Sequence, residues 1–165
     1  MNLQWPFTRD GMAVSRAGLL STCAALALAA QAQIPVKIYA QHLVDEVVAK
    51  NPEVMVIVMR ATPPRSPDEV IIASNIGRIG KKADADDLQV LTTGKPVVKP
   101  HGKGDRFHVE LVLEDASGKP IGALGTVFPY KPGDDSATFV RRAESLRTEF
   151  RERISSIEKL MELDP

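Results

Sequence analysis

The stretch FHVELVLEDASGKPIGALGTVFPY, residues 107–130, decides the fold. Its first half has an apolar residue at every second position: Phe107, Val109, Leu111 and Leu113. Its second half alternates in the same way, and one face holds Gly122, Leu124, Thr126, Phe128 and Tyr130. A period of two residues is typical of strands with one buried face, and ASGKP at residues 116–120 predicts the turn between them. The stretch therefore predicts an antiparallel hairpin.

The segments before the hairpin predict two helices and three further strands. Residues 36–50 carry apolar side chains at helical spacing, and Asn51-Pro52 ends the pattern. Residues 53–61 (EVMVIVMRA) and 68–74 (DEVIIAS) are short and rich in β-branched side chains, which predicts two strands, the first of them in the sheet centre or covered on both faces. Asp84 or Asp86 caps a short helix that Gly94 ends, and residues 95–100 (KPVVKP) form a further strand.

The C-terminal segment predicts one long amphipathic helix over residues 135–161, capped by Asp135 or Ser136. An apolar stripe recurs at intervals of three and four residues: Phe139, Ala143, Leu146, Phe150, Ile154, Ile157 and Met161. Such a stripe either packs on its own domain or forms a seam with a second copy of the chain, and the sequence leaves both open.

Three stretches resemble the PAS-like sensor domains of the Cache type: VIIASNIGRIGKKAD (70–84), TTGKPVV (92–98) and FHVELVLEDASGKPIGALGTVF (107–128). The resemblance implies an α+β fold, in which a five-stranded antiparallel sheet is flanked by an N-terminal helix, a short helical crossover and a long C-terminal helix. It also implies a small-molecule pocket between sheet and crossover. Members of this family are usually extracytoplasmic sensor modules of kinases, chemoreceptors or cyclases. We expect a free-standing domain over residues 33–133 and the amphipathic helix over 134–165.

Residues 1–32 have the layout of a secretory signal peptide, whose start is either Met1 or Met12. Arg9 and Arg16 precede an apolar run at residues 17–30, and cleavage is expected after Ala32. The mature chain then has no cysteine and no apolar stretch long enough to span a membrane. These features predict a periplasmic or secreted protein. The chain has 21 basic and 21 acidic residues, so its charge gives no reason to expect nucleic acid as a partner.

The sequence offers little that predicts catalysis. His101 and His108 are seven residues apart near Asp105 and Glu110, but His101 is expected on a loop, so we predict no metal. The glycines of HGKGD (101–105) and NIGRIGKK (75–82) lack the spacing of nucleotide-binding loops. No GxSxG motif is present, and the mature chain has no thiol nucleophile. We predict no enzyme and no cofactor, and an enzyme that uses the two histidines and a carboxylate is the weaker alternative.

Ligand binding is the function that the residues favour. A guanidinium holds a carboxylate through two parallel hydrogen bonds, so arginines near a pocket suit a carboxylate or an amino acid. The predicted ligand-binding residues are Arg60, Arg78, Arg106, His108 and Tyr130. For each arginine a solvated surface role is the alternative. We therefore predict an exported small-molecule-binding module without catalytic activity. The alternative is an interaction module that dimerises, or docks on a separate signalling protein, through its C-terminal helix.

Overall fold

The computed structural model describes residues 37–164, which belong to one compact unit. The predicted signal peptide, residues 1–32, lies outside the described residues. Along the chain the elements are β1 (Lys37–Ile38), α1 (Tyr39–Lys50), β2 (Val56–Ala61), β3 (Val70–Ser74), α2 (Ala85–Thr93), β4 (Val97–His101), β5 (Arg106–Glu114), β6 (Pro120–Pro129), α3 (Ser136–Arg151), α4 (Ile157–Leu160) and β7 (Leu163–Asp164). No helix among residues 37–164 has the length and apolar character needed to cross a bilayer.

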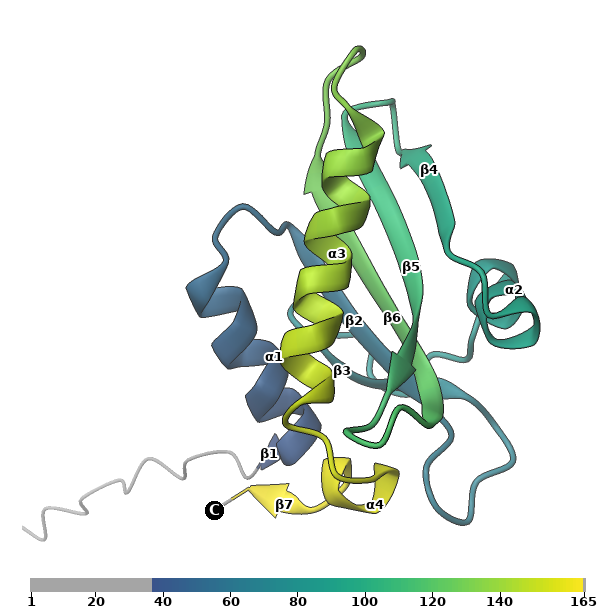
Figure 1. The fold of residues 1–165 in the computed structure, drawn as a ribbon. Coiled ribbons are helices and arrows are strands. Elements are labelled where there is room, and N and C mark those ends of the chain that lie inside the picture. The colour runs from purple at the N-terminus through teal and green to yellow at the C-terminus, as the bar shows by residue number, and fades with distance from the viewer. Residues whose placement is uncertain (1–36, 165) are drawn as a thin grey trace, which may run out of the picture. The chain divides into compact units, whose positions relative to one another are not determined.

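The main sheet has five antiparallel strands in the order β3-β2-β6-β5-β4 (Figure 1). The predicted hairpin forms its longest pairing, with Phe107 opposite Phe128 and Leu111 opposite Leu124. The strand predicted for the sheet centre is β2, which lies between β3 and β6. The predicted α+β fold with a five-stranded antiparallel sheet and flanking helices is therefore confirmed.

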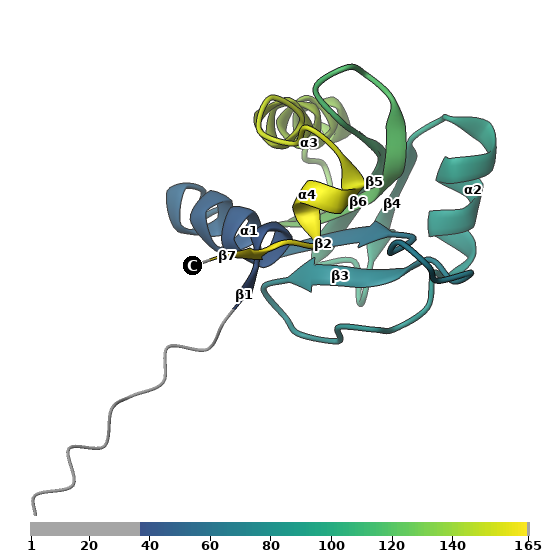
Figure 2. The ribbon, with the colours of Figure 1, turned by 90° about the horizontal axis from the view of Figure 1, so that it is seen from below.

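One face of the sheet carries the main hydrophobic core. Helices α1 and α3 cover this face, whereas α2 lies on the opposite side (Figure 2). The alternating residues of β5 all point into the core: Phe107, Val109, Leu111 and Leu113. Leu43 of α1 and Leu146 of α3 pack against them and are fully or almost fully buried. The burial of this apolar surface is the main source of stability for the fold.

The prediction of one helix over residues 135–161 was wrong, because the chain turns after Arg151. Helix α3 ends there, and α4 begins after Ser156, whose hydroxyl accepts a hydrogen bond from the Lys159 amide at 3.2 Å. The carbonyl of Ile154 accepts a hydrogen bond from the Ala116 amide in the β5–β6 turn, at 2.7 Å. The apolar stripe continues through the turn and packs on the domain's own sheet: Phe139, Ala143, Leu146, Phe150, Ile154, Ile157 and Met161. In the structure the stripe therefore packs on its own domain, which is one of the two arrangements that the sequence left open.

Helix α2 begins with a reciprocal capping box. The Asp84 side chain accepts from the Asp86 amide, and the Asp87 side chain accepts from the Asp84 amide, so both ends of the first turn are fixed. Gly94 ends the helix in the left-handed conformation, with φ of 68°, as the sequence predicted. Leu88 is 53% exposed, so the helix is anchored mainly through buried Val90 and Asp87.

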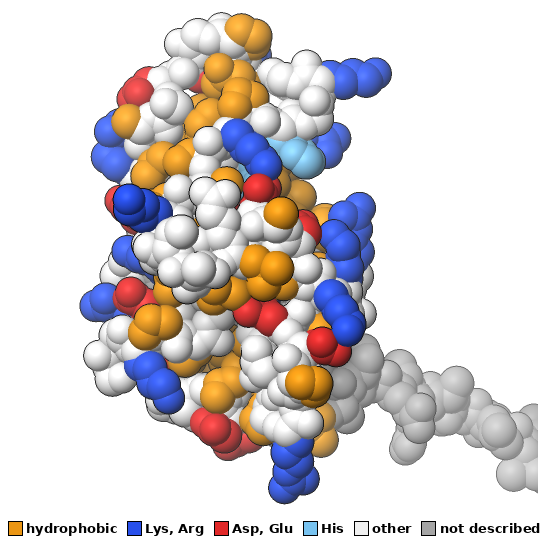
Figure 3. Space-filling model, turned by 90° about the vertical axis from the view of Figure 1, so that its right-hand side faces the viewer, with side chains coloured by type: hydrophobic (Ala, Val, Ile, Leu, Met, Phe, Trp, Pro, Cys, Tyr) orange, Lys and Arg blue, Asp and Glu red, His pale blue; other side chains and the backbone are white. Residues whose placement is uncertain are grey.

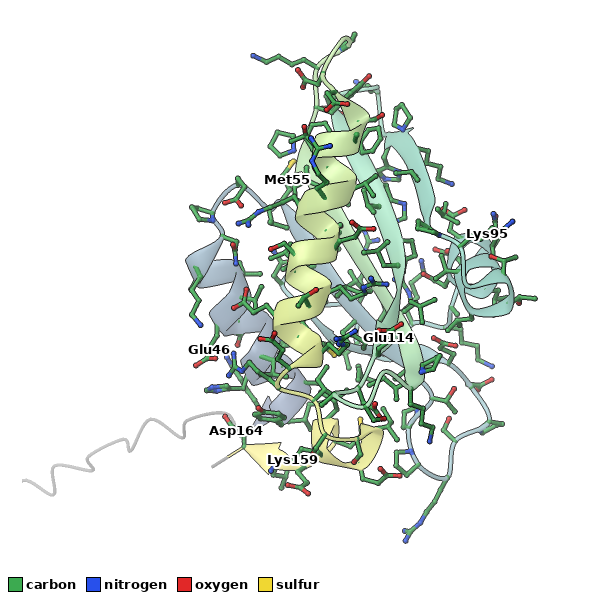
Figure 4. All side chains as sticks on the ribbon, in the orientation of Figure 1. Glu46, Met55, Lys95, Glu114, Lys159 and Asp164 are labelled. Atoms are coloured by element: carbon green, nitrogen blue, oxygen red, sulfur yellow. The ribbon has the colours of Figure 1, made fainter. Side chains whose placement is uncertain are left out.

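The ends of the unit are tied together beside α1. Strands β1 and β7 form a two-stranded antiparallel pair. The imidazole of His42 lies 2.7 Å from Asp164 and 3.1 Å from Glu46, and Glu46 also pairs with Arg153 (Figure 4). These contacts hold the last residues of the unit against its first helix.

Candidate functional site

A pocket of about 200 Å³ lies on the α2 side of the sheet. Strands β2, β5 and β6 form its floor, and the connection from β3 to α2 forms one wall. Its lining residues are Val56, Val58, Arg60, Ile76, Arg78, Lys81, Asp84, His101, Arg106, His108, Glu110, Gly125 and Val127. Figure 3 shows the side of the unit with α2 and β4, where Lys and Arg side chains follow the right-hand edge and a histidine reaches the surface. The resemblance to PAS-like domains implied a pocket between the sheet and this crossover.

Small residues of β6 leave the space for the pocket. A Cβ atom at Gly125 would lie 2.7 Å from Oε2 of Glu110 and 3.3 Å from Nη1 of Arg60. Glycine at this position therefore lets two charged side chains from neighbouring strands lie across the sheet. Val56 and Val127, which pair across β2 and β6, supply an apolar part of the floor.

Four of the five predicted ligand-binding residues line this pocket: Arg60, Arg78, Arg106 and His108. Tyr130 does not, because it lies on the opposite side of the sheet. Its ring packs against Phe107 and Phe139, with centroid distances of 5.3 and 6.0 Å. The strand period explains its place, since Tyr130 continues the series of Leu124 and Phe128, which face the core.

Arg60 is 7% exposed and already has two carboxylate partners. Its Nη1 donates a hydrogen bond to Oε1 of Glu110 at 3.3 Å. Its Nε lies 2.8 Å from Oδ2 of Asp87, although the N–H is not aligned for a hydrogen bond. Glu110 is fully buried and Asp87 is 1% exposed, so this ion-pair network is shielded from water. Arg60 therefore holds the floor together, in contrast to the solvated role left open by the sequence.

Burial changes the protonation of the acids behind Arg60. Desolvation raises the pKa of Asp87 to about 8, and the nearby Glu110 carboxylate adds to the increase, while the Asp84 amide and Arg60 oppose it. Desolvation also raises the pKa of Glu69. The positive charge of Arg60 lowers this pKa, and the negative charge of Glu110 raises it further. The raised pKa shifts the Asp87 side chain toward its protonated form around neutral pH.

His101 belongs to β4 and not to a loop, which corrects the prediction from sequence. It pairs with Arg106, and its ring centroid lies 6.0 Å from that of His108. Nε2 of His108 lies 2.8 Å from Oε2 of Glu110. Within residues 37–164, no group of three or more His, Cys, Asp or Glu side chains is arranged to hold a metal ion.

The mouth of the pocket is cationic. Arg78, Lys81 and Arg106 are exposed there. Lys81 lies 3.7 Å from Asp84, and Arg106 lies 3.9 Å from Asp105. Arg78 has φ of 66°, in the left-handed region that a side chain rarely adopts, and has no ion-pair partner among the described residues. Four cationic and two acidic side chains line the pocket in all, so it carries an excess of positive charge.

Sequence reasoning missed Asp87 and Gly125 and took Glu110 only as a neighbour of the histidines. The signal for Asp87 was its place three residues after the capping Asp84, where an acid closes a capping box. The signal for Glu110 was an acid in the middle of the strand, between the apolar Val109 and Leu111. Gly125 carried the signal of a glycine inside a strand, which often marks a close approach.

No protein-family model and no curated protein matches the chain. Among solved structures, the chain is similar to the GAF domain of A. aeolicus nlh2 in an inactive state, with 11% identity, a TM-score of 0.48, and coverage of 73% of this chain and 82% of that chain. It is also similar to a double mutant of the inducer-binding domain of the PobR transcription factor from Acinetobacter, in complex with 3-hydroxybenzoic acid, with 10% identity, a TM-score of 0.42, and coverage of 70% and 97%.

Proposed function

We propose that this protein is a sensor-like module that binds a small anionic or zwitterionic molecule in the pocket on the α2 side of the sheet. The observation that carries the proposal is a concave site in which cationic side chains at the mouth meet a partly apolar floor. Binding sites of this kind combine apolar walls with a few convergent polar groups.

The size of the pocket limits the ligand. A volume of about 200 Å³ is smaller than the ~300–1,000 Å³ of sites for drug-sized molecules. At about 30 Å³ per water molecule, it holds roughly seven waters, so the ligand has on the order of seven non-hydrogen atoms. A short carboxylate or a small amino acid meets this limit.

The charge of the pocket favours a carboxylate on the ligand. Arg78 and Arg106 are exposed at the mouth, where their guanidinium groups suit bidentate hydrogen bonds to a carboxylate. Val58 and Val127 offer apolar contacts to the body of the ligand. The acids of the floor are occupied by partners within the protein, which supports binding without catalysis.

We also propose that the module is exported, to the periplasm or out of the cell. This proposal is supported by the signal-peptide layout of residues 1–32, with two arginines before an apolar run and small residues at the expected cleavage site. The assignment to the Cache type rests likewise on the sequence stretches that resemble that family.

Two arginines in the same strained backbone conformation provide a matched test of the site. Arg78 (φ 66°) lines the pocket, whereas Arg65 (φ 71°) lies in the β2–β3 connection and does not. Arg78→Gly and Arg65→Gly each remove one charge and one left-handed side chain. Relief of roughly 1–2 kcal/mol of backbone strain is offset by about 0.5–1 kcal/mol of added entropy in the unfolded chain, so both variants are expected within about 1 kcal/mol of the wild type.

The variants are compared by thermal shift in a panel of acetate, propionate, butyrate, pyruvate and alanine at pH 6.5. A ligand at a hundredfold excess over Kd stabilises the wild type by about 2.7 kcal/mol. We expect Arg65→Gly to keep this stabilisation and Arg78→Gly to lose most of it. Equal stabilisation of both variants, or no stabilisation of the wild type by any member of the panel, would contradict the proposed function.

A further inference from the structure

The charges beneath the pocket are unbalanced. One buried guanidinium, that of Arg60, faces the carboxyl groups of Asp87 and Glu110, and Glu69 interacts with both Arg60 and Glu110. His108, 2.8 Å from Glu110, is the one other basic side chain in contact with these three acids among the described residues. Buried acids in excess of their cationic partners are costly unless they take up protons. The arrangement therefore calls for at least one proton on the acids behind Arg60.

Unsatisfied atoms are concentrated in the same place. In residues 37–164, the buried side-chain atoms without a hydrogen-bond partner are Nε of Arg60, Oε1 of Glu69 and Oδ1 of Asp87. Buried polar atoms in native proteins are nearly always paired, so three orphans in one network need an explanation. A hydrogen on Oδ1 of Asp87 accounts for that atom, because it then donates toward the neighbouring Glu110 carboxylate.

The network lies directly under the site of the proposed ligand. Arg60 and Glu110 are lining residues of the pocket, and Asp87 holds Arg60 from the α2 side. A carboxylate that enters the pocket meets the guanidinium of Arg60 and also the negative charge of the acids around it. Each charge on those acids weakens the attraction, because Coulomb interactions are strong where water is excluded. A proton on the acids removes this repulsion.

We propose that the pocket binds its anionic ligand together with a proton, which the buried Asp87–Glu110 pair holds behind Arg60. This inference rests on the proposed function and adds to it a dependence of ligand affinity on pH. The groups that act on Asp87 directly are Arg60 of β2, Glu110 of β5 and Asp84 at the start of α2. Around them, His108 of β5 contacts Glu110 and Asp86, Lys99 of β4 contacts Asp86, and Glu69 before β3 interacts with Arg60 and Glu110.

The experiment measures the Kd of propionate by calorimetric titration at pH 6.5 and pH 9.0. Propionate is fully ionised at both values, so a change in affinity reports on the protein. The acids hold the proton up to about pH 8, so at pH 9.0 the protein must take up a proton when it binds the anion. Kd is therefore expected to be about tenfold higher at pH 9.0 than at pH 6.5. Propionamide, which has no charge, is the control probe and is expected to show no such change.

The Asp87→Asn variant separates a proton on the Asp87–Glu110 pair from pH effects that arise elsewhere in the protein. Its amide is a permanent mimic of the protonated acid. The amide oxygen takes the place of Oδ2, which accepts from the Asp84 amide, and the amide nitrogen takes the place of Oδ1 and donates toward Glu110. We expect the variant to bind propionate at pH 6.5 as the wild type does and to keep that affinity at pH 9.0. A wild-type Kd that is equal at both pH values, or an equal loss of affinity in the variant, would overturn the inference.

A measurement without ligand keeps the inference testable if no probe binds. The folded state raises the pKa of Asp87 relative to the unfolded chain, so the stability that it contributes is full at low pH and is lost as the pH rises to about 8. The folded-to-unfolded ratio of the wild type, relative to Asp87→Asn, is expected to fall by up to about tenfold per pH unit from pH 6.5 to 8. A constant ratio shows that the pair holds no proton and refutes the inference, whereas a falling ratio without binding of any probe contradicts only the proposed function.

Discussion

Replacing Gly122 with alanine is expected to unfold the protein or to lower its free energy of unfolding by about 4 kcal/mol or more. A Cβ atom at this position would lie 1.9 Å from the carbonyl oxygen of Arg60 and 3.1 Å from Cα of Ala61. Both are backbone atoms of β2, which pairs with β6 at this point. Because no side chain is able to move aside, the two central strands must separate, and an effect of this size belongs to the extreme of single substitutions.

Gly133→Ala is the matched control for this substitution. Gly133 has φ of 100° and no atom within 4 Å of an added Cβ, so alanine there costs only the backbone strain of about 1–2 kcal/mol. Urea unfolding followed by circular dichroism measures both variants. If Gly122→Ala lost no more stability than Gly133→Ala, the close pairing of β2 with β6 at Arg60 would be wrong.

Replacing Arg60 with methionine is expected to lower the free energy of unfolding by about 3–5 kcal/mol at pH 7. The substitution keeps an unbranched side chain but removes the guanidinium, which leaves the Glu110 carboxylate buried with only His108 as a partner. Removing one member of a buried ion pair costs this much because the remaining charge is desolvated without compensation. Chemical denaturation at pH 7 measures the loss.

The double variant Arg60→Met/Glu110→Leu tests whether the loss comes from the orphaned charge. Replacing both members of a buried pair with apolar residues is often nearly neutral, so the double variant is expected to recover most of the stability lost by Arg60→Met. An additive loss in the double variant would show that Arg60 stabilises the fold in some other way, such as packing.

The strand pattern was readable from sequence because it depends on neighbours along the chain. The alternation of Phe107, Val109, Leu111 and Leu113 identified the buried face of β5 and the hairpin partner, and the structure has both. The same alternation placed Tyr130 on the core side, which conflicts with its selection as a ligand-binding residue. Here the period of two was a better guide than the residue type.

The break between α3 and α4 was not readable from periodicity. The apolar stripe continues through the break, since Ile154 and Ile157 remain in contact with the core after the helix has ended. Beyond the end of the helix, the carbonyl of Ile154 accepts a hydrogen bond from Ala116, a residue far away in the sequence. The spacing of apolar residues reports which side chains are buried, and it does not report where their carbonyl groups bond.

The floor of the pocket depends on contacts of the same long-range kind. Arg60 and Glu110 are fifty residues apart, and the space for both depends on Gly125 in a third strand. Sequence alone identified Arg60 and His108 as residues able to meet a ligand, but the burial of Glu110 and Asp87 requires the strand order β2-β6-β5 and the position of α2. The residue types were therefore predictable, and the network that joins them was not.

The most direct test of ligand binding in this pocket is a titration of ¹⁵N-labelled protein with propionate at pH 6.5, followed by amide chemical shifts. We expect saturable shifts at the residues that line the site, above all Gly125, Val127 and His108, and in the loop that contains Ile76 and Arg78. The amides around Phe139, on the other side of the sheet, are expected to stay in place. Shifts confined to the α3 side, or no saturable shift at the pocket, would contradict the account.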